Sequence, residues 1–462
     1  MKSTARKTLS KLSLSLYAFA SLGGGMTDFP IAIFLIPFYS EVIGLSPALI
    51  GWLALIPGIY DAITDPFSGN ISDRTRSRFG RRRFWILLGS IPLGLSFWWL
   101  FAPLRGMEAA SFLIAYLFFF TFMDFVFIPQ MAMRAELSAD YDERTRIQGY
   151  NRAFWIIGLL QGVFIPMILG GIFPDKRASY ALMGLIMGAF IAGAGLITFF
   201  GTRENPAFWR DTHVSLSEGL KAIGQNKNFM LLIICNGLYS IGCAIPNTLL
   251  IYYALNWLKV PEADVLAAVP IYLVASVLSV PVWVALSKKI QKKPTYILAF
   301  ITAGIGGLFC LFIPRGQVLP LYFIFVIAGA GYGGLMAIPG AMVADVIDLD
   351  EYKTGDRREG VFFGVWEFFR KFAHNIAIWL VMQILALIGY VQQTQQTPQV
   401  ENGIRLMFAL LPMFFYFTGA VVISFFNYNK EEVEKVQQML RSKVGPERTA
   451  TPSEPTPAPP AR

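Results

Sequence analysis

Two carboxylates stand four residues apart in an apolar stretch, at Asp61 and Asp65. On a helix, positions i and i+4 lie on one face, one above the other. An Asp in the bilayer core costs at least ~2.5 kcal/mol, so acids there are rare and usually serve an ion or substrate path. We therefore interpret the pair as a functional site. A helix-end cap or a buried salt bridge is the alternative.

The composition indicates that membrane helices must position this pair. Of 462 residues, 55% are hydrophobic and only 15% are charged, whereas soluble domains carry about 25% charged residues. The net charge of +9 comes from short basic clusters between apolar stretches, which fits membrane orientation and not nucleic-acid binding. Three cysteines in apolar stretches and two histidines show no metal-ligand spacing.

Twelve apolar stretches are long enough to cross about 30 Å of hydrocarbon, so we predict an all-α polytopic membrane protein. They lie near residues 14–40, 48–71, 83–104, 110–133, 150–172, 179–201, 228–256, 264–286, 294–314, 318–344, 361–389 and 404–427. The longest internal polar loop divides them six plus six. The predicted parts are an N-terminal six-helix bundle at 1–201, a cytoplasmic linker at 202–227, a C-terminal six-helix bundle at 228–428, and a cytoplasmic tail at 429–462 with a disordered, Pro-rich end.

The two halves of the chain resemble each other. Met133 to Arg144 and Met342 to Lys353 each follow a proline-containing span and end in a mixed-charge turn. Parallel repeats of this kind are typical of alternating-access transporters, which bind substrate near the bilayer midplane. Basic residues concentrate in the loops after spans 2, 4, 8 and 10. The positive-inside rule therefore predicts a multi-pass protein of the inner membrane with both termini in the cytoplasm.

A glycine- and arginine-rich loop follows the span that carries the two acids. It includes Gly69, Asp73, Arg74 and Arg81, and it resembles the signature loop of the major facilitator superfamily. The resemblance implies a gate in which the glycine permits close helix approach and the acidic and basic residues form ion pairs. The alternative is that the arginines only anchor the loop on the cytoplasmic side.

The order of the motifs is similar to that of one family in this superfamily. Asp61 to Pro66, the arginine-rich loop, Met342 to Asp345, Asp350 to Lys353 and a membrane Lys371 together resemble the glycoside–pentoside–hexuronide:cation symporters. The resemblance covers all twelve spans. It implies the major facilitator fold, with two six-helix pseudo-repeats, and symport of a sugar, glycoside or uronate with Na⁺, H⁺ or Li⁺.

The resemblance also implies a cation site. It assigns the ligands to Asp61, Asp65, Thr64 and Thr121, which offer the oxygen atoms that a hard ion prefers. Two carboxylates held close together repel each other, so the pair favours a proton or a cation. Lys371 matches a lysine that approaches this cluster and offsets one acid when no cation is bound. The alternative is a lysine that reaches out to water.

Several spans contribute to the predicted solute site. The resemblance assigns Asp28, Asp124 and Arg152 to it, and such groups make strong charge-assisted hydrogen bonds to hydroxyls. A structural ion pair between Asp28 and Arg152 is the alternative. Four further positions belong to the predicted site. Thr27 stands where the family's best-known member has a lysine, and Ile128 and Met336 stand where it has tryptophans. Trp366 offers a ring for stacking.

We expect a transporter and no enzyme, because the sequence shows no nucleophile–base pair, metal cluster or phosphate loop. The expected partners are a small-molecule solute, a monovalent cation and the lipid bilayer, with no nucleic acid and no cofactor, for a protein that acts as a monomer. Two alternatives remain open. One is cation-coupled transport of an amphiphile such as a lysophospholipid, because a more apolar pocket suits an acyl chain. The other is a non-transporting membrane scaffold or sensor.

Overall fold

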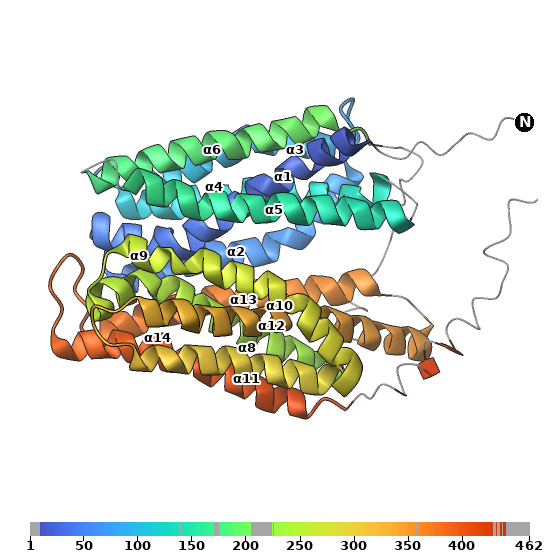
Figure 1. Cartoon of the computed structure of the whole chain (residues 1–462). Helices are drawn as coiled ribbons and strands as arrows, with labels where there is room; N and C mark the ends of the chain where they lie inside the picture. Colours follow the sequence, from blue (N-terminus) through green and yellow to red (C-terminus); the bar gives the residue numbers. More distant parts are fainter. Residues whose placement is uncertain are drawn as a thin grey trace, which may run out of the picture.

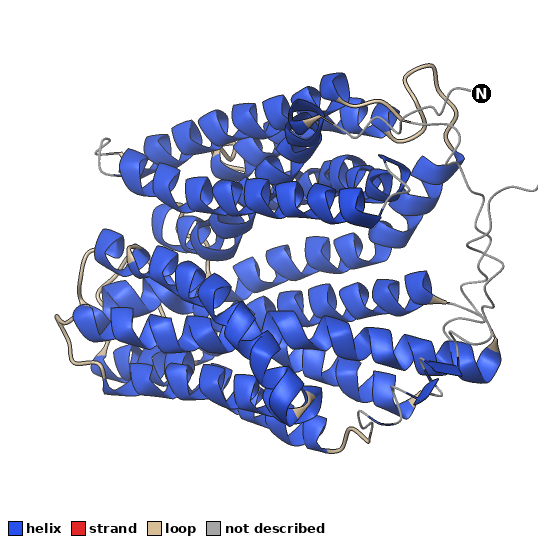
Figure 2. Cartoon of the chain, turned by 45° about the vertical axis from the view of Figure 1, so that its right-hand side comes forward, coloured by secondary structure: helices blue, strands red, loops and turns tan. Residues whose placement is uncertain are grey.

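Long helices lie side by side with similar axis directions and make up the protein (Figure 1). The structure is a computed structural model, which describes residues 10–137, 141–170, 175–204, 224, 226–355, 358–427, 431, 435–436 and 438–439. In this part of the chain, Figure 2 shows helices and loops but no strand. The all-α prediction is therefore confirmed. Most of the predicted linker and the Pro-rich tail lie outside the described residues.

Two groups of long helices are present. The first bundle contains α1 (Lys11–Phe29), α2 (Pro47–Arg74), α3 (Arg83–Phe101), α4 (Glu108–Leu137), α5 (Tyr141–Gly170) and α6 (Lys176–Gly201). The second bundle contains α8 (Lys227–Tyr252), the short α9 (Glu262–Leu266), α10 (Ala268–Ile290), α11 (Lys292–Phe309), α12 (Leu319–Thr354), α13 (Glu359–Leu387) and α14 (Pro398–Ser424).

Eleven helices in the described residues are long and apolar enough to cross a membrane. They match eleven of the twelve predicted spans. The remaining span, predicted at 361–389, coincides with α13. Polar side chains such as Lys371, Asn375 and Gln383 lower the apolar content of this helix, and they lie against α2. The same residues thus lower the hydropathy by which a membrane span is detected and form the contact between the bundles.

Several helix ends differ from the prediction. Helix α5 begins at Tyr141 and α12 continues to Thr354, because polar turns extend the helices beyond their apolar cores. The first span is not one α-helix. It changes at Pro30 into the π-helical turns η1 (Pro30–Leu35) and η2 (Phe38–Val42). Proline lacks an N–H and cannot continue the regular hydrogen-bond ladder, so the local pitch changes there.

The packing inside one bundle repeats inside the other. In the first bundle α1 packs against α5 and α6, α3 packs against α4 and α6, and α2 packs against α4. The second bundle contains the corresponding contacts of α8 with α13 and α14, α11 with α12 and α14, and α10 with α12. Equivalent helices therefore make equivalent contacts. The boundaries at 1–201, 202–227, 228–428 and 429–462 stay a prediction.

One end of the molecule, which we call the closed end, is held by hydrogen bonds between the bundles. Glu41 in η2 accepts hydrogen bonds from Tyr390 Oη at 2.8 Å and from the backbone N–H of Gln393 at 3.4 Å. Gln392 Nε2 donates to the carbonyl of Gly44 at 3.1 Å. These bonds join the segment before α2 to the loop after α13.

A cavity of about 2240 Å³ lies between the bundles. Its lining reaches Arg74 and Arg81 at the opposite end of the molecule, where α1 begins and α14 ends. We call this the terminal end. Since the closed end is tied across the bundles, the cavity extends toward the terminal end.

Candidate cation and solute site

Helix α2 carries a polar face half-way along its length. Asp61, Thr64, Asp65 and Ser68 follow the spacing i, i+3, i+4 and i+7, which places them on one side of a helix. Asp61 is 2% exposed, and Ser68 is also buried. The face turns toward the protein, as expected for charged groups inside a membrane.

Close packing of α2 against α13 brings this polar face beside the second bundle. A Cβ built on Gly58 would overlap the side chain of Asn375, and one on Gly51 would lie 2.9 Å from Gln383 Nε2. Gln383 Nε2 also donates to the carbonyl of Ala48 at 3.1 Å. A Cβ at Gly58 would displace Asn375, and one at Gly51 would require Gln383 to move, so both glycines favour the close approach of the two helices. We call this contact the α2–α13 seam.

Lys371 of α13 reaches across the seam to both acids of α2. Its Nζ lies 2.9 Å from Asp61 Oδ2 and 2.7 Å from Asp65 Oδ2. The lysine side chain is 20% exposed, so it does not extend into bulk water. One ammonium group thus bridges two carboxylates inside the protein, which is the arrangement expected of the predicted coupling lysine.

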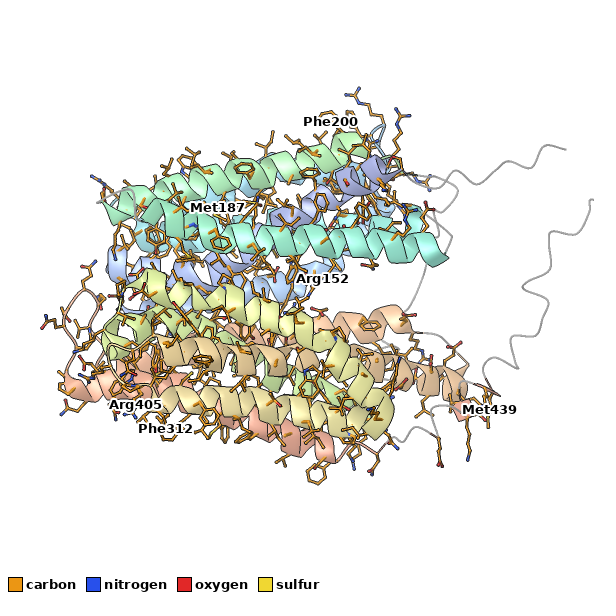
Figure 3. All side chains as sticks on the ribbon, in the orientation of Figure 1. Arg152, Met187, Phe200, Phe312, Arg405 and Met439 are labelled. Atoms are coloured by element: carbon orange, nitrogen blue, oxygen red, sulfur yellow. The ribbon has the colours of Figure 1, made fainter. Side chains whose placement is uncertain are left out.

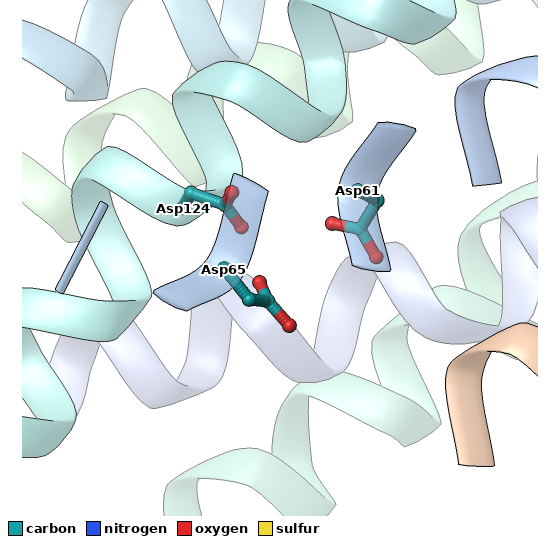
Figure 4. Close-up of side chains that lie close together, drawn as sticks. All are labelled: Asp61, Asp65 and Asp124. Carbon is teal, nitrogen blue, oxygen red and sulfur yellow. The ribbon is translucent and has the colours of Figure 1, made fainter. Parts of the chain in front are cut away.

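Asp124 of α4 joins the same cluster (Figure 4). One carboxylate oxygen from each of Asp61, Asp65 and Asp124 lies within 4.8 Å of the others. Thr64 Oγ1 donates to Asp124 Oδ2 at 3.0 Å, and Ser68 Oγ donates to the same atom at 3.4 Å. The sequence groups Asp124 with the solute-site residues, but the geometry places its carboxylate beside the predicted cation ligands.

Thr121 occupies a different position from the other predicted ligands. Its Oγ1 donates to the carbonyl of Leu117 at 2.8 Å and shares a hydrogen bond of 2.9 Å with Tyr60 Oη. Among the described residues it makes no hydrogen bond to the three carboxylates. The structure therefore brings Asp61, Thr64 and Asp65 together and leaves the Thr121 hydroxyl bonded to its own helix and to Tyr60.

The cluster contains an oxygen that lacks a protein partner. Asp61 Oδ1 is buried and, within the described residues, accepts no hydrogen bond, while Oδ2 of the same group contacts Lys371. A buried carboxylate oxygen without a partner is costly. Carboxylate and hydroxyl oxygens are ligands for hard cations, so these donors suit a monovalent ion such as Na⁺.

The predicted solute residues line the cavity from both bundles. Asp28 and Arg152 are exposed to it, and Figure 3 places Arg152 on the side of α5 that faces the second bundle. The guanidinium carbon of Arg152 lies 4.2 Å from the centroid of the Trp155 ring. Among the described residues, Asp28 and Arg152 form no ion pair with each other. Both therefore keep polar atoms available inside the cavity.

The other predicted solute positions contribute unequally. Thr27 is buried, and its hydroxyl donates to the carbonyl of Gly24 at 2.7 Å, so it is used within its own helix. Ile128 and Met336 line the cavity with apolar surface. Trp366 also lines it but is mostly covered at 7% exposure, and its backbone carbonyl accepts a hydrogen bond from Asn236.

A group of tyrosines in the second bundle was not predicted. Tyr239, Tyr272 and Tyr332 all line the cavity, and the Tyr332 ring centroid lies 5.9 Å from that of Tyr239 and 5.3 Å from that of Tyr272. They supply aromatic faces and hydroxyls that Ile128 and Met336 do not. The three tyrosines come from α8, α10 and α12, so no local sequence pattern joins them. Ser68, by contrast, was detectable from its i+7 spacing to Asp61.

The predicted gate residues lie at the terminal end. Arg74 is exposed, Arg81 is buried, and both line the cavity. Gly69 packs near Ile128, while the side chain of Asp73 lies outside the described part of the chain. The carboxylate of Glu204, just after α6, accepts hydrogen bonds of 2.6 to 2.8 Å from the backbone N–H groups of Arg81, Arg82 and Arg83. Glu204 thus caps α3 beside the gate loop.

Comparison with known proteins decides the family. The family described as MFS/sugar transport protein matches residues 16–430, which include all the long helices except the start of α1. The chain belongs to this family. The predicted membership in the glycoside–pentoside–hexuronide:cation symporters is therefore confirmed, as is the major facilitator fold.

Relatives whose names give different solutes align over most of the chain. A glucuronide carrier protein homolog of Escherichia coli (strain K12) is 26% identical and covers 92% of this chain and 97% of its own. The isoprimeverose transporter of Lactiplantibacillus pentosus is 24% identical, with 87% and 85% covered. The sodium-dependent lysophosphatidylcholine symporter 1-A of Danio rerio is 22% identical, with 91% and 88% covered.

A solved structure supports the fold of this family member. The bacterial homolog of the human lysosomal transporter Spinster, in an inward-facing and unoccupied conformation, superimposes with a TM-score of 0.68. The alignment covers 92% of this chain and all of that one, at 13% sequence identity. At this identity the likeness concerns the fold alone.

Proposed function

We propose that the protein is a secondary transporter that takes up a sugar, glycoside or uronate together with a monovalent cation. The observation that carries this proposal is the ammonium group of Lys371 between Asp61 and Asp65, at the contact of the two bundles. Breaking a buried ion pair is expensive, so a cation that replaces the lysine at the acids changes the packing of α2 against α13. Ion binding and helix rearrangement are then one event.

The solute binds in the cavity between the bundles in this proposal. Asp28 and Arg152 bond its hydroxyl or carboxylate groups, and Tyr239 and Tyr332 provide ring faces and hydroxyls opposite them. Binding to both bundles at once favours the state in which they close around the solute. The cavity can open at the closed end only when the hydrogen bonds of Glu41 break. This second opening completes the alternating-access cycle.

The remaining assignments follow from this transport cycle. The coupling ion is Na⁺, H⁺ or Li⁺, and the protein acts as a monomer without enzymatic activity or nucleic-acid binding. The arginines of the gate loop support an orientation in which the terminal end lies on the cytoplasmic side of the inner membrane. Each charge that crosses ~100 mV is worth ~2.3 kcal/mol, which drives accumulation of the solute.

Uptake by the purified protein in liposomes tests this function. We expect an inward sodium, lithium or proton gradient to drive accumulation of a radiolabelled glucuronide or methyl glycoside, and an equal potassium gradient to drive none. Asp61→Asn with Asp65→Asn removes the dependence on the ion. Absence of ion-driven uptake in both the wild type and the double variant would instead support a scaffold or sensor.

An amphiphile such as a lysophospholipid is the second candidate solute. It is favoured by apolar cavity lining where α5 faces α10, from Ile156, Leu160, Val277 and Leu278. Leu278 is 69% exposed, so an acyl chain finds apolar surface there. Labelled lysophosphatidylcholine in the same liposome assay separates the two solutes, because a sugar site yields no ion-driven uptake of the lipid.

A further inference from the structure

Helix α13 carries an ion pair that has no part in the proposed transport cycle. Glu367 Oε2 and Arg370 Nε lie 2.7 Å apart, one turn from each other on the helix. Both residues line the cavity, and their side chains are 48% and 39% exposed, so a solute can reach them. A pair exposed to this degree adds little stability, whereas charged groups within membrane spans usually serve a substrate or ion path.

Contacts with α8 fix the place of Arg370. Ser240 Oγ donates to the backbone carbonyl of Arg370 at 2.8 Å, and the two helices pack against each other. Adjacent residues on a helix point about 100° apart, so Arg370 points away from the α2–α13 seam that Lys371 reaches. Helix α13 thus presents one cation to the acids of α2 and another to a different part of the cavity.

That part of the cavity holds the predicted solute residues of the first bundle. Arg370 is the charged group that acts most strongly on Asp28. Arg370 and Arg152 also share two neighbours, since both interact electrostatically with Tyr239 and Tyr332. The guanidinium group of Arg370 therefore faces Asp28 and Arg152 from the second bundle.

The guanidinium group of Arg370 keeps donors for a solute. Its Nε donates to Glu367, whereas Nη1 and Nη2 make no hydrogen bond within the part of the chain that the structure describes. Hydrogen bonds from a guanidinium group to a hydroxyl oxygen are charge-assisted and strong. A solute held by Asp28 and Arg370 contacts both bundles at once.

An acid accompanies each of the two arginines in this part of the cavity. Glu367 pairs with Arg370, and Asp28 lies close to Arg152. Lys371 lies at the acids of α2, and the gate arginines line the cavity only at the terminal end. A carboxylate on the solute therefore adds a negative charge that no free cation balances, which is costly once the cavity closes. An uncharged solute avoids this cost.

We propose that Arg370 binds the solute from the second bundle and that Glu367 holds this arginine in a neutral pair, so that the protein prefers an uncharged glycoside to a uronate. This inference rests on the proposed function and narrows its solute. Arg370 contacts the solute itself. Glu367 acts through Arg370 and is a positioning residue.

Matched solutes test the preference. Methyl glucoside and methyl glucuronide differ only at carbon 6, as do methyl galactoside and methyl galacturonide. Each is offered to the full-length protein in liposomes under the same ion gradient at pH 8, where His374 is neutral because the ordinary pKa of histidine is about 6.5. We expect the wild type to have a KM for the glycoside of at least one pair that is about tenfold lower than for its uronide. An equal or lower KM for the uronide overturns the proposal.

Glu367→Gln separates selection of the solute from a purely structural role. It keeps the shape of the side chain and removes its charge, so Arg370 is free to pair with a carboxylate. We expect the ratio of the two KM values to shift toward the uronide by about tenfold, while uptake of the glycoside is largely retained. An equal effect on both solutes means that the pair is only structural, and the proposal is wrong. Glu262→Gln is the matched control, because it removes an acid from an exposed ion pair outside the cavity and should leave the ratio unchanged.

Arg370→Gln tests the contact with the solute. We expect a higher KM for both members of a pair, because a donor is lost and Glu367 is left without its partner. Adding Glu367→Gln restores neutrality and should recover part of the glycoside uptake without a gain for the uronide. An unchanged KM in Arg370→Gln contradicts the proposal, provided that thermal unfolding shows each variant to be folded. If the wild type prefers the uronide, this inference fails and the proposed function stands. If no ion gradient drives uptake of either member of a pair, the proposed function itself fails.

Discussion

The internal repeat makes two contacts between bundles equivalent, yet they differ greatly. The α2–α13 seam and the contact of α5 with α10 exchange places when one bundle is superimposed on the other, since α2 corresponds to α10 and α5 to α13. Helices α2 and α13 pack closely along much of their length, through Gly51, Gly58 and the bonds of Lys371. Helices α5 and α10 touch at only a few positions.

In the proposed transport cycle, the difference assigns two tasks to two parts of one fold. The close seam carries the acids, the lysine and the side chains that fix helix distance, so it suits the coupling ion. The loose side carries Arg152, apolar cavity lining and the tyrosines near it, so it suits the solute. The repeated packing places an equivalent contact on each side, and different residues give each contact its own chemistry.

The largest effect is expected where the close seam loses its charge balance. Lys371→Ala leaves the buried Asp61 and the partly exposed Asp65 without their ammonium partner, and breaking a buried ion pair such as that of Asp61 costs about 3–5 kcal/mol. We expect a clearly lower midpoint of thermal unfolding in detergent without added sodium, and partial recovery when sodium is added. Lys176→Ala is the control, because its bond to Glu262 is exposed at the loose side. An equal loss of stability in both variants contradicts the account.

A smaller effect is expected from steric separation of the same seam. Gly58→Val places a side chain where Asn375 now lies, and overpacking of this kind costs about 1–3 kcal/mol. We expect a large loss of ion-driven uptake and only a moderate loss of stability, because Lys371 moves away from Asp61 and Asp65. Gly193→Val in α6 is the matched control, since a Cβ there meets no atom within 4 Å. Ion-driven uptake unchanged by Gly58→Val shows that helix distance does not matter for coupling.

The closed end offers a prediction of intermediate size. Tyr390→Phe removes the hydrogen bond to the carboxylate of Glu41, and hydrogen bonds to charged groups contribute about 1.5–3 kcal/mol. We expect faster hydrogen–deuterium exchange in residues 41–46, because the end opens more often. Exchange equal to that of the wild type means that Tyr390 does not hold the end closed.

The smallest effect belongs to the loose side. Glu262→Ala removes the bond of 3.2 Å to Lys176, an exposed ion pair of the kind worth about 0–1 kcal/mol. We expect thermal unfolding and ion-driven uptake close to those of the wild type. A large loss of uptake would mean that the α5–α10 side also couples the bundles, and the contrast between the two contacts would disappear.

The sequence predicts some of these features well and others not at all. The spacing of Asp61 and Asp65 within one apolar stretch is a local signal, as is the depth of Lys371 in its span, and these residues do meet. The position of Asp124 depends on how α4 is rotated against α2, which only the packed bundle determines. Its hydrogen bonds from Thr64 and Ser68 are therefore absent from the sequence prediction.

Contacts between distant segments account for the remaining omissions. Tyr239, Tyr272 and Tyr332 lie on three helices, and none stands in a motif. Glu41 and Tyr390 form a hydrogen bond although they are far apart in the sequence, and no periodic pattern links them. The π-helical turns after Pro30 were missed for another reason. Proline signals an interruption but does not specify which helical pitch follows.

The central claim is that the acids of α2 convert ion binding into solute transport. Its most direct test compares two reactions of the Asp61→Asn, Asp65→Asn double variant in liposomes. We predict that exchange of labelled for unlabelled solute continues, while accumulation driven by an ion gradient is lost. Accumulation at the rate and extent of the wild type would contradict the account.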